Sequence, residues 1–174
     1  TRLSSDLEHA EQLAERIHQA HPDGPVCLVA HSLGGLISRY YAQVLGGRVD
    51  ALVTIGTPHR GTALARGWPM RLARELSPGS QLLRTLTATR SRLDHAKLTS
   101  VIAVQDSLVP CHSAALDGSR AVYVDGVGHH GVLFHRHTWA AAENGITLTE
   151  CDGQFNPDTK QAQLQDAIAS VLAT

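Results

Sequence analysis

Short apolar segments that alternate with helical segments are the feature that most restricts how this chain can fold. Four apolar runs have the length and continuity of strands buried on both faces: 25–30, 50–57, 98–104 and 120–124. Segments with helical spacing lie before, between and after these runs: 3–17, 33–45, 131–145 (closed by Gly145) and 158–173. Strands that alternate with helices favour a parallel sheet with right-handed crossovers, so the sequence predicts an α/β fold.

One segment, 60–97, interrupts this alternation between the second and third predicted strands. It contains short helical pieces at 70–76 and 80–88, around Pro69 and the turn sequence SPGS. A long insertion between two core strands often forms a lid over a site at the end of the sheet. The sequence therefore predicts one α/β domain over 1–174, with 60–97 as a lid or cap insertion within it.

The composition excludes several classes of function. Of the 174 residues, 43% are hydrophobic and 18% are charged, and the formal net charge is −1. Without an overall basic field, no nucleic-acid partner is expected, and no apolar run is long enough to span a membrane. Transient contact with a lipid interface stays open; compartment and oligomeric state are not readable from the sequence. Local arginines are interpreted as a solvated polar face: Arg60, Arg66, Arg71, Arg74, Arg84, Arg90 and Arg92.

The chain has three cysteines, Cys27, Cys111 and Cys151, at wide spacings. An odd count in this pattern fits neither a disulfide-rich scaffold nor a zinc-binding motif. Cys27 lies in an apolar run and is interpreted as a small core residue. A bridge between Cys111 and Cys151 is left open.

The sequence AHSLG sets Ser32 between the first predicted strand and the helix that follows it. This is the small-x-Ser-x-Gly pattern of a nucleophile elbow, a sharp turn that exposes a serine hydroxyl. Ala30 and Gly34 are expected to be small because the strand and the helix approach closely at these positions. The helix begins at the serine, so the backbone N–H of Leu33 is the predicted oxyanion-hole donor. His31 is expected to pack beside the site.

A serine nucleophile needs a base, and the base needs an orienting acid. In parallel sheets such groups follow later strands, at the carboxyl edge. Asp106 follows the third predicted strand, and His129 follows the fourth in a glycine-flanked loop. Asp125 is the alternative acid and His130 the alternative base.

The histidines after the fourth strand also raise the question of a metal site. His129, His130, His135 and His137 show no ligand set at tetrahedral spacing with a carboxylate. A serine–histidine–aspartate site accounts for His129 better, so neither a metal nor another cofactor is predicted.

With strand, elbow, acid and histidine assigned, the sequence resembles the α/β-hydrolase superfamily, and within it the bacterial lipases and esterases of the triacylglycerol-lipase type. The motifs that carry the resemblance are VAHSLGGLISRYY, VTIGTPHRGTALA, LSPGSQLLRTL, VQDSLVP and GVGHHGVLFH. The resemblance implies Ser32 as nucleophile, Asp106 as acid and His129 as base. It also implies a mobile cap at 60–97 over an acyl-chain site, bordered by the turn at 57–62. The substrate-binding residues expected from it are His31, Thr57, Pro58 and His59.

One departure from the family pattern concerns the start of the chain. A complete α/β-hydrolase has strands before the elbow strand, and a loop there, often beginning His-Gly, supplies a second oxyanion donor. This chain begins at the helix before the elbow strand. The expectation is therefore the C-terminal part of a hydrolase, with an α/β-hydrolase fold that is incomplete at its N-terminus.

The function expected from these residues is hydrolysis of carboxylic esters through an acyl-enzyme, on a small-molecule ester or lipid. Apolar residues of the insertion favour a lipid-like acyl group, unless they only pack onto the sheet: Leu72, Leu76, Leu82, Leu83 and Leu86. The alternatives are an acyltransferase, thioesterase or amidase on the same three residues, because specificity lies in the pocket. A third alternative is an inactive hydrolase fragment that acts as a binding module.

Overall fold

The structure is a computed structural model that describes residues 5–63 and 71–147. The helix predicted at 158–173 and Cys151 lie outside these residues, so that helix and the Cys111–Cys151 bridge stay predictions. The described elements, in chain order, are α1 (Ser5–Ala20), β1 (Val26–His31), α2 (Leu33–Gln43), β2 (Val49–Ile55), α3 (Arg71–Glu75), α4 (Gln81–Ala88), η2 (Arg90–Leu93), β3 (Lys97–Ala103), α5 (Cys111–Ala114), β4 (Arg120–Val124), η3 (Gly131–Phe134) and α6 (Arg136–Thr147).

The four strands form one parallel sheet in the order β1-β2-β3-β4. Each predicted strand is present, to within two residues at either end. The predicted burial on both faces is confirmed for β2 and β3 and was wrong for β1 and β4, which lie at the two ends of this strand order. The register aligns Ile55 of β2 with His31 of β1 and with Val101 of β3. The carboxyl ends of the strands therefore lie along one edge of the sheet, where parallel sheets build their sites.

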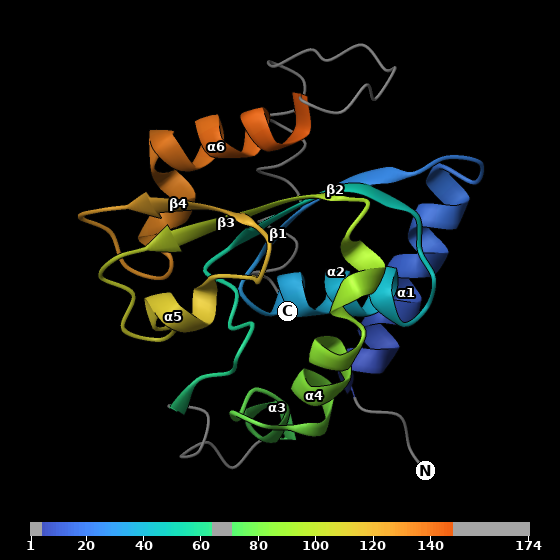
Figure 1. Cartoon of the computed structure of the whole chain (residues 1–174), viewed down its shortest axis with the longest axis horizontal. Helices are drawn as coiled ribbons and strands as arrows, with labels where there is room; N and C mark the ends of the chain where they lie inside the picture. The colour runs from blue at the N-terminus through green and yellow to red at the C-terminus, as the bar shows by residue number, and fades with distance from the viewer. Residues whose placement is uncertain (1–4, 64–70, 148–174) are drawn as a thin grey trace.

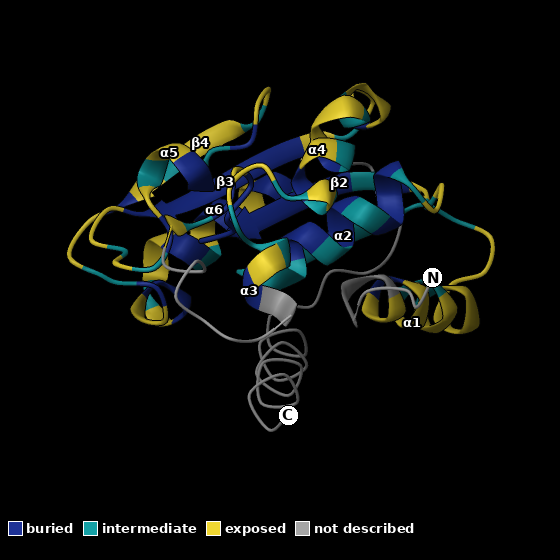
Figure 2. Cartoon of the chain, turned by 90° about the horizontal axis from the view of Figure 1, so that it is seen from below, coloured by how far each residue is buried: buried dark blue, intermediate teal, exposed yellow. Residues whose placement is uncertain are grey.

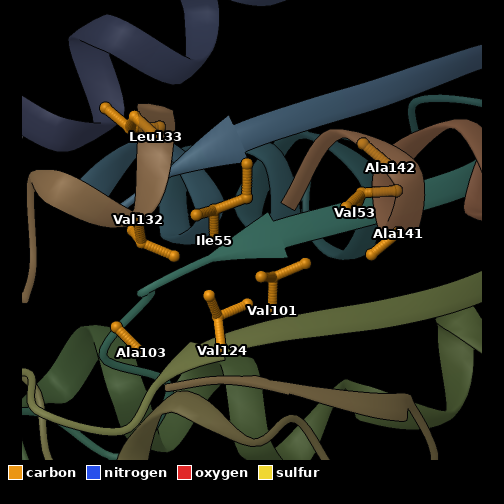
Figure 3. Packing of buried hydrophobic residues seen from close by; sticks show 9 residues of the cluster. All are labelled: Val53, Ile55, Val101, Ala103, Val124, Val132, Leu133, Ala141 and Ala142. Carbon is orange, nitrogen blue, oxygen red and sulfur yellow. The ribbon is translucent and has the colours of Figure 1, made fainter. Parts of the chain in front are cut away.

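Helices cover both faces of the sheet, with α6 on one side and α1, α2 and α5 on the other (Figure 1). Successive side chains of β2 point to opposite faces of the sheet, as in any β-strand. Val53 packs toward Ala141 and Ala142 of α6, and Ile55 lies beside Val132 of η3 (Figure 3), whereas Leu52 packs with α2. The continuous apolar sequence of β2 follows from this burial on both faces.

The central strands are more deeply buried than the outer ones. β2 and β3 are buried along almost their whole length, while β1 is half-buried and β4 carries exposed residues (Figure 2). Tyr123 on β4 is 61% exposed. No helix in 5–63 or 71–147 is long and apolar enough to cross a membrane.

The helix predicted over 131–145 is two elements in the structure. The extended backbone of His135 (φ −88°, ψ 129°) separates η3 from α6. The prediction that Gly145 ends the helix was wrong, because α6 continues to Thr147. A Cβ at Gly145 would lie 2.8 Å from Cγ2 of Val53 and 3.1 Å from Oγ1 of Thr99. Glycine is needed here because α6 approaches the sheet closely, and it is not a helix stop.

The insertion contributes α3 and α4, in agreement with the helical pieces predicted there, and η2, which was not predicted. Ser80 caps α4, with its hydroxyl accepting a hydrogen bond from the backbone N–H of Leu83 at 3.3 Å. Leu83 and Leu86 are buried against Leu36 of α2. This part of the insertion therefore packs onto α2, and movement of 60–97 as a lid stays a prediction.

Two adjacent glycines of α2 differ in the space around them. A Cβ at Gly34 would lie 3.7 Å from Cβ of Ala30, which is an ordinary contact. A Cβ at Gly35 would lie 2.2 Å from Oγ1 of Thr57, whose side chain is fully buried. The expected approach of β1 and α2 at Ala30 and Gly34 is thus present, with room for a methyl group at Gly34. A tighter approach, which was not predicted, lies between α2 and the segment after β2, at Gly35.

We expect Gly35→Ala to lower the free energy of unfolding by about 1–3 kcal/mol, because the added methyl group overpacks against Thr57. Gly34→Ala, its matched control, has room for the methyl group and should leave the stability unchanged or raise it by up to about 1 kcal/mol. Urea unfolding of both variants measures the difference. Equal effects of the two substitutions would contradict the close approach at Gly35.

Candidate active site

Ser32 sits at the turn between β1 and α2 in a strained backbone conformation. Its φ of 51° and ψ of −124° make it the one non-glycine residue with positive φ in the described part of the chain. Such a conformation costs roughly 1–3 kcal/mol and persists only where its surroundings impose it. Here the Ser32 N–H donates to the carbonyl of Ile55 at 2.8 Å, and the Ser32 carbonyl accepts from the N–H of Gly35 at 3.1 Å.

The hydroxyl of Ser32 begins a chain of two hydrogen bonds. Its Oγ lies 2.9 Å from Nε2 of His129, and Nδ1 of that ring lies 2.7 Å from Oδ2 of Asp106. A carboxylate can only accept, so Nδ1 carries the proton and Nε2 accepts from the serine hydroxyl. The three side chains come from the turns after β1, β3 and β4, which lie along the carboxyl edge of the sheet.

Both Asp106 and His129 are shielded from water, with side chains 1% and 7% exposed. Oδ1 of Asp106 accepts from the backbone N–H groups of Leu108 and Val109 at 2.8 and 2.9 Å. One carboxylate oxygen is thus held by the turn that follows β3, and the other is left for the histidine. Hydrogen bonds from several donors stabilise a buried carboxylate in its charged form.

His31 supports the backbone of His129. Its Nε2 lies 3.0 Å from the carbonyl oxygen of His129, and because that oxygen can only accept, Nε2 of His31 carries a proton. The two rings are stacked at an angle, with centroids 4.7 Å apart. Burial lowers the pKa of His31 to about 4, against the opposing effect of the hydrogen bond to His129. A neutral His31 therefore holds the loop that carries the other histidine.

Gly56 lies directly against the histidine–aspartate pair. A Cβ at this position would lie 3.4 Å from both Oδ2 of Asp106 and Nδ1 of His129, and the φ of Gly56 is 54°. The backbone N–H of Gly56 donates to the carbonyl of Val101 at 2.9 Å, which ties the end of β2 to β3. The positive φ favours glycine here, whereas the space beside the pair would admit a Cβ in ordinary van der Waals contact.

The alternative acid and base lie elsewhere. Asp125 is exposed, and the amide of Gln105 donates to it and lowers its pKa. His130 is exposed and contacts the His129 ring edge-on, with centroids 5.1 Å apart. His135 and His137 pair with each other. Within the described residues, no three His, Cys, Asp or Glu side chains are grouped so as to hold a metal ion.

The other expected site residues are placed as follows. Leu33 is the residue after Ser32 and the first residue of α2, so its backbone N–H has no acceptor within the helix. Thr57, Pro58 and His59 are buried. The ring of His59 contacts Thr54 and Arg39 through its two nitrogens, at 3.0 and 3.3 Å. Substrate contacts by Thr57, Pro58 and His59 stay predictions.

Comparison with known proteins identifies the family to which this chain belongs. Residues 3–89, half of the chain, match the family described as alpha/beta hydrolase fold. The chain belongs to this family. The predicted resemblance and fold class are thereby confirmed.

Two curated relatives of this α/β hydrolase are named triacylglycerol lipase, from Pseudarthrobacter phenanthrenivorans and Burkholderia plantarii. Each is 55% identical over 40 residues, which is 23% of this chain and 12% or 11% of the relative. The matched segment thus spans about an eighth of the curated relatives' length.

Solved structures share the fold of this hydrolase. A protein of Listeria innocua aligns over 86% of this chain and 69% of its own, with a TM-score of 0.66 and 13% identity. A monoacylglycerol lipase of Paleococcus ferrophilus aligns over 80% and 76%, with a TM-score of 0.53 and 15% identity. At such identities the likeness concerns the fold alone.

Sequence reasoning predicted that His31 packs beside the site, but it missed Gly56 and the contact that His31 makes with His129. Gly56 carried a usable signal, because a glycine directly after a buried strand at the carboxyl edge often marks a close approach. The bond from His31 to the backbone of His129 had no signal in the sequence, since it joins loops after the first and last strands.

The shifted pKa of His31 predicts an acid-sensitive contribution to stability. In the folded chain this pKa is about 4, below the ordinary value of 6.5, and the nearby charged groups are His129, His130 and Asp106. The unfolded chain therefore binds more protons between these pH values. The stability that neutral His31 contributes is complete above about pH 6.5 and is lost as the pH falls toward 4.

We expect His31→Gln, which keeps an amide donor for the His129 carbonyl, to lose less stability than the wild type between pH 6.5 and 4. Urea unfolding across this range measures it, with exposed His137→Gln as the control. Parallel pH curves for the wild type and His31→Gln would contradict the assignment.

Proposed function

We propose that this α/β hydrolase cleaves carboxylic esters, with Ser32 as nucleophile, His129 as general base and Asp106 as the orienting acid. The single observation that carries the proposal is the hydrogen-bonded chain from Ser32 through His129 to Asp106, built on a strained elbow. The relatives named triacylglycerol lipase support an ester as the substrate class.

Acylation follows from the protonation states in the site. The Ser32 oxygen forms a bond to the ester carbonyl carbon as its proton passes to Nε2 of His129. The resulting imidazolium is stabilised by Asp106, which lies 2.7 Å from the other ring nitrogen. The negative charge on the former carbonyl oxygen accepts a hydrogen bond from the N–H of Leu33, at the positive end of α2.

The second half of the reaction restores the enzyme. As the tetrahedral intermediate collapses, the ester bond breaks, and His129 gives its proton to the leaving alcohol. His129 then takes a proton from water, whose oxygen attacks the acyl-serine. Ser32 leaves with that proton, and the carboxylic acid is released. His31, through the His129 backbone, keeps the imidazole in place for both steps.

The leucines of the insertion divide into two groups. Leu83 and Leu86 are buried with Leu36 and serve packing. Leu76 and Leu82 are only partly buried in the same cluster, together with Leu33, which adjoins the nucleophile. The side chain of Leu72 lies outside the described part of the structure. The half-buried leucines support a lipid-like acyl group beside Ser32.

A fluorophosphonate should label Ser32 covalently in the wild type and leave Ser32→Ala unlabelled. The wild type should hydrolyse p-nitrophenyl esters of several chain lengths, and Ser32→Ala should lower kcat by roughly 10⁴-fold or more. Labelling is read by mass spectrometry and turnover by absorbance.

Other outcomes of this experiment are equally decisive. Labelling without ester cleavage, but with thioester or amide cleavage or acyl transfer, would replace the ester proposal by one of those activities on the same residues. No labelling and no turnover would leave a binding module in place of an enzyme.

Asp106→Asn should lower kcat by roughly 10⁴-fold while the fold is kept. The amide oxygen still accepts from Leu108 and Val109, but its NH₂ group faces Nδ1 of His129 and imposes the wrong tautomer. Asp125→Asn is the matched control and should leave kcat unchanged. The proposal fails if the two variants are equally active on p-nitrophenyl esters.

A further inference from the structure

The structure contains a cavity of about 570 Å³, and none of the three proposed catalytic residues lines it. Its walls come from α2, α4, η2 and the segments around residues 59–60 and 115–117. The helices α2, α4 and α5 lie on the same side of the sheet (Figure 1). The charged lining is unbalanced, with four arginines (Arg39, Arg60, Arg84 and Arg90) against the single carboxylate of Asp117.

Arg39 is the buried member of this set, with 2% of its surface exposed. Its Nε donates to Gln43 and its Nη2 to the Leu86 carbonyl, both at 2.8 Å, and its Nη1 contacts Nδ1 of His59 at 3.3 Å. A guanidinium carries five N–H donors, so two of them have no acceptor among the described residues. No carboxylate in the same residues lies within ion-pair distance of Arg39.

His59 cannot supply the missing negative charge. Arginine only donates, so Nδ1 of His59 accepts, and Nε2 donates to Oγ1 of Thr54 at 3.0 Å. Burial lowers the pKa of His59 well below its ordinary value, and the charges of Arg39 and Arg60 lower it further. His59 is thus a neutral wall of the cavity.

The electrostatics around Arg39 are unfavourable for a buried cation. Burial lowers its pKa to about 10, and the charge of Arg90 adds to the effect, while Asp117 opposes it. A buried charge is normally paired, because removing it from water is costly. An anion in the cavity would supply the counter-charge.

The other arginines at the cavity are arranged in two ways. Arg60 pairs with Asp117 at 2.5 Å, and Arg90 pairs with Asp94 at 2.7 Å. Arg84 donates to the carbonyl of Gly79 and pairs with no carboxylate among the described residues. Arg39 and Arg84 are therefore the two lining arginines whose charge is not matched within the described structure.

The cavity is larger than a bare ion needs and has an apolar wall. Small-molecule sites usually occupy about 300–1,000 Å³ and combine apolar lining with a few placed polar groups. Leu83 and Leu116, which are almost fully buried, supply such a wall. A ligand with a compact apolar body and an anionic end fits both features.

We propose that this cavity binds a small molecule through an oxyanion, a carboxylate or a phosphate, held by Arg39 and Arg84. Guanidinium groups recognise both anions through paired N–H donors. None of the proposed catalytic residues lines the cavity, and anion binding there does not rest on ester hydrolysis, although the wall includes His59, for which a substrate contact is predicted. Arg84 is exposed, as the solvated polar face expected from the sequence requires, and the proposal adds a binding role to it.

The proposal is tested by calorimetric titration of purified Ser32→Ala protein with phenyl phosphate, benzoate and uncharged benzyl alcohol at constant ionic strength. Phenyl phosphate or benzoate should bind saturably, and benzyl alcohol should not; the tighter anion identifies the preferred class. Arg84→Gln should weaken that binding roughly tenfold, as expected for loss of a charged hydrogen-bond donor. Arg120→Gln, which removes an exposed arginine of β4, should leave it unchanged.

Three results would overturn the proposal: no binding of either anion, equal binding of benzyl alcohol, or equal effects of Arg84→Gln and Arg120→Gln. Circular dichroism checks that each variant is folded. If Arg84→Gln does not fold, Arg84→Lys is compared with Arg120→Gln instead, because it keeps the charge but loses the paired N–H donors and should also weaken anion binding. Because Ser32 is absent from every protein titrated, the result is independent of the ester-hydrolysis proposal.

Discussion

The backbone hydrogen bond from Ser32 to the carbonyl of Ile55 is the interaction on which the rest of the site depends. It continues the β1–β2 ladder one residue past the strand and so holds the serine in its strained conformation. The same extension recurs where Gly56 donates to Val101 and Val104 donates to Val124. The loops that carry the three proposed catalytic residues thus leave the sheet from rigid, mutually bonded positions.

Helix α2 connects the elbow to the arginine-lined cavity. Its N-terminal end follows Ser32, Gly35 packs against Thr57, and Arg39 lies about one turn beyond Gly35. Arg39 and Gln43 both donate to the carbonyl of Leu86, which fixes α4 to α2. One buried helix therefore positions the proposed nucleophile, the packed part of the insertion and the buried guanidinium. Its buried polar side chains need hydrogen-bond partners, just as its apolar side chains need packing partners.

The strands, the elbow turn and the order of the proposed acid and base along the chain were predictable, because each depends on a local pattern in the sequence. Continuous apolar runs indicate strands buried on both faces, and a parallel sheet brings the residues after each strand to one edge. On that basis Asp106 and His129 were selected over Asp125 and His130, and the structure brings the first pair to Ser32. The roles of Gly145 and Gly35 were not predictable, because each depends on how close a helix comes to another segment.

The sequence by itself determined the class of fold and the residues from which a serine-based site can be built, because both follow from periodicity and chain order. Only the tertiary structure decided which groups support that site. His31 reaches the His129 carbonyl, and Gly56 lies under the Asp106–His129 pair, through contacts between loops of different strands. The tertiary structure likewise turned dispersed arginines into a cavity with a buried, unmatched charge, because burial and the distance between charges exist only once the chain has folded.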